Sequence, residues 1–498
     1  MKLLKYSLLM IVLLSMSSCM SISKYNYSIT QKRYPIDALN EDVDLIFNSL
    51  KKKHPGVYWY ISEEALNGQI DSLKNSFTDP LTSKEFYLRV APIVASINCG
   101  HTRLFLSSTK KTNGQENKQT SLLKQNTFFV NDSKLYFKSI NNPSQRNSIG
   151  SEILSINDCS TDKIVENLKK YIPSDGYNQT FKYELLNRNF ASLYEQIYGV
   201  TDTLNFEISD STNVRSIHLT KPSLKKETKS KIVVNKKEKL DKKNRYKGLD
   251  ENKQAILDYK LIDNSSKTAY LKIKSFSFDH SNFSKFYTES FHRIQEEKVE
   301  NLILDLRDNG GGSLKASRTL FSYLTDSTYT YLKPVETKGR FTAKSTVLDK
   351  LFSPTNWLIN RFLFYKKDGK YYAKVKGTKP LKPKKDNFKG NLYVITNGLS
   401  FSASSLLAAN LKGLERVTFV GTETGGGFNQ CVAGRLPIVK LPNTGLKLRY
   451  GLYVLSPTFQ SEVYGRGVFP DIIVNKQKED YLQKRDIEVD TIVKMIKN

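Results

Sequence analysis

Cysteine is scarce in this sequence, with four residues among 498. Three of them, Cys99, Cys159 and Cys431, lie beyond the N-terminal segment, and an odd number cannot form a complete disulfide framework. Their spacing also differs from that of zinc ligands. The sequence therefore predicts neither a disulfide-stabilised fold nor a cysteine-based metal site.

Long hydrophobic runs are missing as well. Residues 6–16 form a short apolar stretch that cannot span a membrane; it follows a basic start and precedes small residues ending at Cys19. This order is typical of a secretory signal. Residues 1–19 resemble a bacterial lipoprotein signal, in which Cys19 is lipidated and becomes the first mature residue. Cleavage without lipidation is the alternative. The resemblance implies a protein anchored by lipid to a bacterial membrane in the cell envelope, facing the periplasm or the surface.

Acidic residues are too few to balance the basic ones: 77 Lys and Arg against 49 Asp and Glu give a net charge of +28. The basic residues are scattered, and neither zinc-finger spacing nor an RNA-binding motif accompanies them. We therefore expect no nucleic-acid partner, while attraction to an anionic envelope surface stays open. A hydrophobic content of 39% indicates a globular protein, and the length allows two to four domains.

The first part of the mature chain has helical patterns. Residues 20–34 are predicted to be a polar tether, and residues 35–110 an N-terminal helical domain with helices over 38–53, 66–77 and 83–96, the last capped by Thr82 or Ser83. His54 is expected to end the first helix. His101 follows a glycine and precedes a short strand, so we expect its imidazole at a loop edge, where it can accept a proton near neutral pH.

Residues 120–176 have another pattern, with strands over 127–130 and 135–139, the segment I-G-S-E-I-L-S-I-N at 149–157 and a helix over 161–171. This pattern resembles the carboxyl half of a PDZ domain, which captures chain ends by adding a strand to a sheet edge. An ordinary strand-turn-strand-helix unit is the alternative. Residues 177–222 are interpreted as a helix-strand connection, in which His218 is structural. Residues 223–250 are interpreted as a basic linker.

Residues 251–475 alternate strands and helices, which is typical of an α/β core. A predicted strand over 301–306 leads into D-N-G-G-G-S, where Gly311 and Gly312 allow close backbone approach and an array of N–H donors. A tight turn is the alternative, and phosphate-loop spacing is absent. Residues 324–388 are predicted to be an insertion that covers one face like a lid. Residues 476–498 predict a C-terminal helix.

Residues 393–430 predict a strand, a tight turn, a helix, a strand and a glycine loop. Ser402 stands where the turn enters the helix, so the free N–H groups and the positive end of the helix point at its oxygen. This position suits a nucleophile. The alternative is that Ser400, Ser402, Ser404 and Ser405 are helix caps or packing residues.

Three separated motifs occur in a particular order: G-H-T at 100–102, D-L-R-D-N-G-G-G at 305–312, and S-F-S-A-S-S at 400–405 followed by G-T-E-T-G-G-G at 421–427. With the PDZ-like segment after the first motif and G-R-G-V-F-P-D at 465–471, the chain resembles the C-terminal processing (tail-specific) serine peptidases. The resemblance implies an α/β fold with a crotonase/ClpP-like peptidase core, an N-terminal helical domain and a PDZ-like domain. It also implies that Ser402 is the nucleophile and that backbone N–H groups of Ala403 and of Gly311 or Gly312 hold the oxyanion.

The general base differs between branches of that family. The Ser-Lys branch has a lysine at the position of Gly427, and no lysine occurs in residues 413–439. The tricorn-like branch uses a histidine in a G-H-T type motif, which His101 matches. In that branch a serine precedes the histidine, where this chain has Gly100, and a distant glutamate completes the set. Glu462 is the candidate for that glutamate.

These features predict a serine endopeptidase that cleaves polypeptides in the cell envelope through recognition of their C-terminal ends. His101 would take the Ser402 proton during attack and return it to the leaving amine, with Glu462 orienting the imidazole and without a metal or organic cofactor. The alternative is a catalytically inactive peptide-binding lipoprotein on the same scaffold, which the absent lysine and Gly100 favour. An acyl-thioester enzyme would suit the core alone, but such substrates are cytosolic and the secretory signal argues against it.

Overall fold

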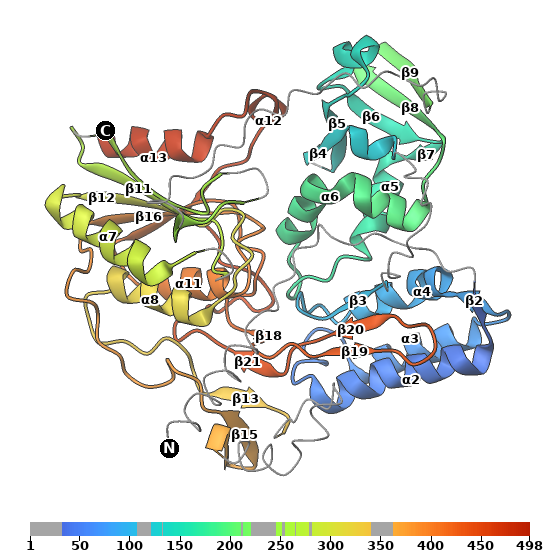
Figure 1. The fold of residues 1–498 in the computed structure, drawn as a ribbon, viewed down its shortest axis with the longest axis horizontal. Helices are drawn as coiled ribbons and strands as arrows, with labels where there is room; N and C mark the ends of the chain where they lie inside the picture. The colour runs from blue at the N-terminus through green and yellow to red at the C-terminus, as the bar shows by residue number, and fades with distance from the viewer. Residues whose placement is uncertain are drawn as a thin grey trace.

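The computed structural model describes residues 32–498 apart from 107–120, 132, 211–212, 221–245, 251–253, 264, 278–280 and 340–361. The expected signal peptide with Cys19, nearly all of the tether and most of the basic linker lie outside the described residues. No helix in the described part of the chain is long and apolar enough to cross a membrane. Figure 1 shows three bodies: an N-terminal helical unit, a unit built on an antiparallel sheet, and an α/β core.

The core is built on a six-stranded sheet with the order β10-β11-β12-β16-β17-β22. Only the edge strand β10 is antiparallel to its neighbour, and the other pairs are parallel. The strands are β10 (Leu257–Asp263), β11 (Thr268–Ile273), β12 (Asn301–Asp305), β16 (Asn391–Thr396), β17 (Val417–Gly421) and β22 (Ile472–Ile473). This arrangement confirms the predicted α/β core.

Helices cover both faces of that sheet (Figure 1). One face carries α7 (Phe283–Glu296), α8 (Leu314–Leu324) and α11 (Ala403–Leu411), and the other carries α13 (Ile487–Lys497), whose Ile492 packs on Ile303 and Ile395. Parallel strands that are buried on both faces read as continuous apolar runs, and all of β12 is buried. The short helix α12 (Lys478–Gln483) precedes α13.

The N-terminal unit contains the three predicted helices, α2 (Ile36–Lys53), α3 (Glu63–Asn75) and α4 (Ser83–Ala95). Its start and its third helix are joined by two short paired strands, β1 (Arg33–Tyr34) and β2 (Leu81–Thr82). Thr82 caps α4 in a reciprocal box with Glu85, with the two hydrogen bonds at 3.2 Å and 2.7 Å. His54 ends α2 as predicted, since its N–H donates to the Leu50 carbonyl at 2.9 Å.

The next unit has an antiparallel sheet that continues beyond the predicted boundary at residue 176. Its strands follow the order β4-β5-β6-β8-β9, and β7 pairs with β6. Because β8 and β9 belong to it, residues 203–220 are part of this sheet and not a separate connection; His218 lies on β9 and its ring contacts Asn205. Its elements are η2 (Leu123–Gln125), β4 (Thr127–Asn131), β5 (Lys134–Ser139), η3 (Pro143–Ser148), β6 (Glu152–Ile156), β7 (Cys159–Ser160), α5 (Thr161–Lys169), α6 (Thr180–Tyr198), β8 (Thr203–Asp210) and β9 (Asn213–Thr220).

Residues 324–388 form a small sheet of their own and also add side chains to the hydrophobic core. A small sheet in the order β13-β15-β14 forms here, while Tyr331, Val335 and Phe364 are buried in the same hydrophobic cluster as the central strands. The segment is therefore partly structural. Residues 340–361 of the predicted insertion lie outside the described residues. The strands are β13 (Val335–Thr337), β14 (Phe364–Lys367) and β15 (Lys370–Ala373).

Strands from the C-terminal third join the N-terminal unit to the core. The hairpin of β19 (Ile438–Lys440) and β20 (Lys447–Arg449) pairs with β3 (Arg103–Phe105), which directly follows His101. A second pair, β18 (Cys431–Ala433) and β21 (Tyr453–Leu455), lies at the base of this hairpin. This pairing of residues far apart in the chain fixes the loop that carries His101.

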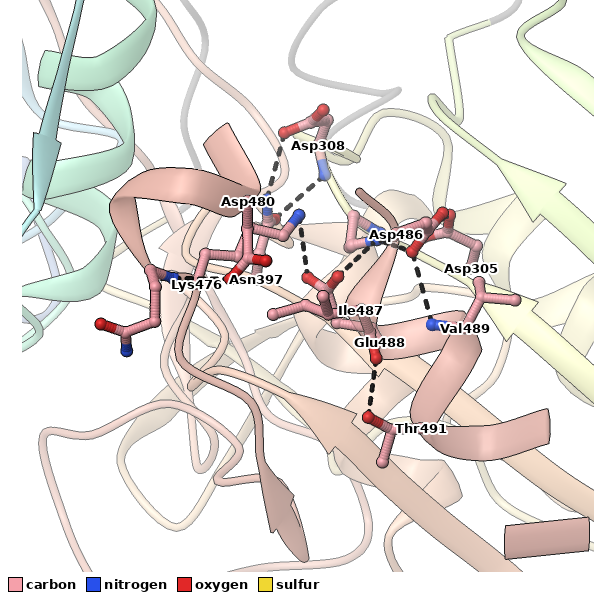
Figure 2. A network of polar contacts seen from close by, with 12 residues as sticks. Asp305, Asp308, Asn397, Lys476, Asp480, Asp486, Ile487, Glu488, Val489 and Thr491 are labelled. Atoms are coloured by element: carbon pink, nitrogen blue, oxygen red, sulfur yellow. Dashed lines mark hydrogen bonds and ion pairs between the residues drawn. The ribbon is translucent and has the colours of Figure 1, made fainter. Parts of the chain in front are cut away.

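Arg307 of the D-L-R-D motif binds the C-terminal segment. Arg307 contacts Asp305 at 2.8 Å, both carboxylate oxygens of Asp486 at 2.7 Å and 2.9 Å, and Glu488 at 3.0 Å. Figure 2 shows this network around the start of α13, where Lys476 also pairs with Glu488 at 3.2 Å. Arg307 therefore has a structural partner set and anchors the loop that leads to the glycine motif.

Candidate active site

Ser402 occupies a strained position between β16 and α11. Its backbone has φ 58° and ψ −120°, a left-handed conformation that costs a non-glycine residue about 1–3 kcal/mol. It precedes α11 at the N-cap position, yet its side chain caps no N–H of the helix. The hydroxyl is therefore directed to another partner, and the helix-cap alternative does not describe Ser402.

The turn before Ser402 is held by side-chain to backbone bonds. The Ser400 hydroxyl donates to the Leu306 carbonyl at 2.7 Å, and the Phe401 N–H donates to the Asn309 carbonyl at 2.9 Å. Ser405 donates to the Ser402 carbonyl at 2.8 Å. These serines have the structural roles that were the alternative for the whole cluster, and they stabilise the strained residue.

The partner of the Ser402 hydroxyl is His101. Its Nε2 lies 3.0 Å from the Ser402 Oγ, although 301 positions separate the two residues. The imidazole packs on the Phe401 ring, with centroids 4.7 Å apart, and is 6% exposed. Burial lowers the pKa of His101 to about 3, with smaller contributions from Arg449 and His54. The imidazole is thus neutral at pH 7 and can accept the serine proton.

In the described part of the chain, no carboxylate is hydrogen-bonded to the other imidazole nitrogen of His101. His101 Nδ1 is buried without a hydrogen-bond partner among the described residues. Glu462, the sequence-based candidate for this place, is exposed, and no hydrogen bond joins it to His101. The expectation that Glu462 orients the imidazole is therefore not met in this structure, because the loop around Glu462 directs it to solvent.

Asp175 was not foreseen from the sequence. Its carboxylate accepts the Gly100 N–H at 2.8 Å and the Gly427 N–H at 3.2 Å, and the side chain is 4% exposed. It therefore joins the loop of His101 to the glycine-rich loop behind Ser402. Burial raises the pKa of Asp175 to about 6, although its two backbone hydrogen bonds act in the opposite direction. The segment S-D-G between two helices is the only sequence signal of this role.

The glycine motif lies against the nucleophile. A Cβ added to Gly311, at φ +91°, would lie 2.7 Å from the Ser402 Cβ and 2.9 Å from the Ala403 nitrogen. The missing side chain of Gly311 therefore leaves open the volume next to the Ala403 nitrogen. The Gly311 N–H itself donates to the Asn309 side chain at 3.0 Å, so it is not available to an oxyanion in this state. Ala403 and Gly312 remain the candidate donors from the predicted set.

The glycine-rich loop at 425–427 packs behind Ser402. Gly425 and Gly426 donate to the Ser400 carbonyl at 3.1 Å and 3.3 Å, and a Cβ on Gly426 would lie 2.1 Å from the Ser405 hydroxyl. Gly427, the position of the lysine in the other branch, contributes only its N–H to Asp175. No group of three or more His, Cys, Asp and Glu side chains suited to a metal ion occurs among the residues that the structure describes.

Comparison with solved structures finds proteins whose folds are similar to that of this chain. Two structures of mature CPAF, one alone and one complexed with lactacystin, have TM-scores of 0.61 and 0.60 at 14% and 15% identity, and each comparison covers 93% of this chain and 98% of that chain. The photosystem II D1 C-terminal processing protease has a TM-score of 0.41 at 14% identity, covering 88% of this chain and 93% of that chain. No curated protein sequence matches the chain significantly.

The likeness to CPAF at this identity shows a shared fold along nearly the whole chain. The chemistry follows from a second comparison: residues 267–474 match the model of peptidase family S41. The matched range contains the glycine motif, Ser402 and the glycine-rich loop. This chain therefore carries a peptidase family S41 domain and is a serine-type peptidase.

Proposed function

We propose that the protein is an endopeptidase in which Ser402 is the nucleophile and His101 the general base. The 3.0 Å contact between Ser402 Oγ and His101 Nε2, made by a serine in a strained turn, is the observation that carries this proposal. The Oγ–C bond to the peptide carbonyl forms as the proton moves to His101. The C–N bond then breaks, and His101 returns the proton to the leaving amine. Water hydrolyses the acyl-enzyme by the same steps in reverse.

The Ala403 N–H supports the oxyanion part of this mechanism. It starts α11, where the helix dipole favours negative charge, and it faces the space left by the missing side chain of Gly311. Losing one donor of this kind costs about 2.7–4 kcal/mol of transition-state stabilisation. Gly312 would supply the second donor.

The test is covalent labelling of the folded protein with a fluorophosphonate probe. Wild type should be labelled, Ser402→Ala should not, and His101→Ala should be labelled at least 100-fold more slowly. Ser404→Ala is the matched control, because Ser404 lies two residues further on and its hydroxyl has no hydrogen-bond partner within the described part of the chain. Lactacystin, which one CPAF structure contains, provides a second probe. Absence of labelling in folded wild type would favour the peptide-binding alternative, for which the unpartnered His101 Nδ1 is the supporting observation.

The N-terminal sequence and the second unit support a proposal for the cellular role. We propose that Cys19 is lipidated and holds the enzyme in the cell envelope, and that the sheet of residues 127–220 binds substrate C-termini as a PDZ-like unit. Helix α6 supports delivery from this unit, because its first turn reaches the site: the Phe181 ring stacks on the Phe401 ring at 4.7 Å. Lipid labelling that is lost in Cys19→Ser tests the anchor. Tighter binding of peptides with a free carboxylate than of their amides tests the second proposal.

A further inference from the structure

Large apolar side chains are exposed on two segments that are hydrogen-bonded to the loops of the proposed active site. Tyr177 is 57% exposed, Val463 is 53% exposed and Tyr464 is 68% exposed. Tyr60 adjoins them, with its ring centroid 5.5 Å from that of Tyr177 in an edge-on arrangement. We name Tyr60, Tyr177, Val463 and Tyr464 the tyrosine rim. Exposed apolar clusters on soluble proteins commonly mark binding surfaces.

The backbone beneath the tyrosine rim is fixed. The Tyr177 N–H donates to the Gly465 carbonyl at 2.8 Å, and Gly465 lies directly under both rings. A Cβ there would come within 2.8 Å of the Tyr177 ring and 3.1 Å of the Tyr60 ring, at φ +72°. A glycine at this position therefore allows the rings to approach each other over the loop. The exposed side chains stand on an ordered base.

Two further anchors hold the loop of Val463 and Tyr464. The side chain of Asn429 donates to the Ser461 carbonyl at 2.9 Å and accepts the Ser461 N–H at 2.7 Å. Arg466 binds both oxygens of the buried Glu423 at 3.0 Å and 2.7 Å. Asn429 and Glu423 belong to the glycine-rich loop region behind Ser402, so the tyrosine rim is bound to the scaffold of the nucleophile.

The rim is also joined to the general base. Tyr177 lies two residues after Asp175, whose carboxylate holds the Gly100 N–H next to His101. Between them, the Gly176 N–H donates to the Asn98 carbonyl at 2.9 Å. Since consecutive Cα atoms are about 3.8 Å apart, the backbone of Tyr177 lies within a few residues' reach of the imidazole loop. The tyrosine rim is therefore connected by hydrogen bonds to the loop of His101 and, through Asn429, to the loop behind Ser402.

We propose that the tyrosine rim binds a bulky apolar side chain of the polypeptide substrate, next to the bond that is cleaved. This inference rests on the proposed function and adds the substrate class to it. Tyrosine presents a large, rigid apolar face with few rotatable bonds, so it loses little entropy when it binds. The fixed backbone adds preorganisation. An aromatic or large aliphatic residue fits this surface better than a small or charged one.

The experiment separates binding from cleavage. Ser402→Ala protein is titrated with a fluorescent peptide that carries phenylalanine near its centre and with the same peptide carrying serine there. We expect the phenylalanine peptide to bind at least about 10-fold more tightly, as burial of such a side chain implies. Adding Tyr464→Ser or Tyr177→Ser should remove most of this preference. Adding Val214→Ser is the control, because Val214 is 60% exposed on β9 of the other unit.

A preference that persists in both tyrosine variants would overturn the proposal, as would equal binding of the two peptides. Fluorophosphonate labelling of Tyr464→Ser and Tyr177→Ser with Ser402 intact shows whether the catalytic pair survives. Normal labelling with lost selectivity supports both the rim and the enzyme. Selective binding without any labelling in wild type would refute the proposed catalysis and leave the rim standing, so the two failures are distinguishable.

Discussion

Asp175 should control the acid limb of activity. Its two carboxylate oxygens accept the Gly100 and Gly427 N–H groups, one each, and protonation makes one of these oxygens a weaker acceptor. Because burial raises the pKa of Asp175 to about 6, protonation on passing below pH 6 places an O–H against one of these donors. One of the hydrogen bonds that join the His101 loop to the glycine-rich loop is then weakened. We expect kcat/KM to fall below pH 6 even though His101, with a pKa of about 3, stays neutral.

The magnitude follows from one charge-assisted hydrogen bond. Asp175→Asn keeps one oxygen acceptor and turns an NH2 group toward the second N–H, so one bond is lost. A hydrogen bond to a charged group contributes about 1.5–3 kcal/mol, which corresponds to about a 10- to 150-fold change in rate if all of it positions His101. Asp175→Asn should therefore lose about 10- to 150-fold in kcat/KM at pH 8. It should be nearly independent of pH between 5 and 8.

The assay is the initial rate of labelling or peptide hydrolysis across this pH range, with circular dichroism to verify folding. The ionisable groups near Asp175 should not produce an acid limb of their own, because burial raises the pKa values of Tyr60, Cys99 and Cys431 and these groups stay protonated between pH 5 and 8. Glu184→Gln is the control, because burial raises the pKa of Glu184 to about 7 and its removal should leave the limb in place. An acid limb near pH 6 that persists in Asp175→Asn would refute the reasoning.

Three further results are expected. Gly311→Ala should slow labelling of Ser402 at least about 100-fold and destabilise the fold, since its Cβ would lie 2.7 Å from the Ser402 Cβ at φ +91°, whereas Gly310→Ala, with no atom within 4 Å, should behave as wild type. Burial lowers the pKa of His54 and of His101 from 6.5 to about 3, so below pH 6.5 each imidazole is protonated in the unfolded chain but stays neutral in the folded protein. The free energy of unfolding therefore falls as pH falls from 6.5 toward 3, by about 2 kcal/mol per histidine at pH 5. Urea unfolding at pH 8 and pH 5 should show that His54→Gln loses about 2 kcal/mol less than wild type over this range. Glu462→Gln should change kcat/KM less than about 2-fold, as an exposed side chain would, and a 100-fold loss would instead show that Glu462 reaches His101 during turnover.

Local patterns predicted the elements of the fold well. Residue spacing alone indicated three features: the cap of α4 near Thr82, the strand that precedes the glycine motif, and the turn before Ser402. Each of these features is formed by residues that are close together in the sequence. Ser402 and His101 came from motif resemblance, and the structure brings them within 3.0 Å.

Features that depend on distant partners were not visible in the sequence. The pairing of β20 with β3 joins residues 447–449 to 103–105, and neither strand has a pattern that names its neighbour. The same holds for Asp175, whose role exists only because two loops from different parts of the chain present N–H groups to it. The proposed contact of Glu462 failed for a related reason, since sequence order does not tell which way a loop residue points.

The strand pairing between β3 and β20 makes the position of the His101 loop depend on a segment far along the chain. Residues 447–449 are synthesised after His101, so the strand that pairs with β3 is still absent when the loop of His101 has been made. Closing a chain segment of this length costs little more entropy than closing a shorter one, so assembly is limited by the availability of the late strand and not by distance. In the proposed mechanism, a nascent chain therefore carries His101 and Ser402 as separate parts, and we expect proteolytic activity only after residues 447–449 have been made.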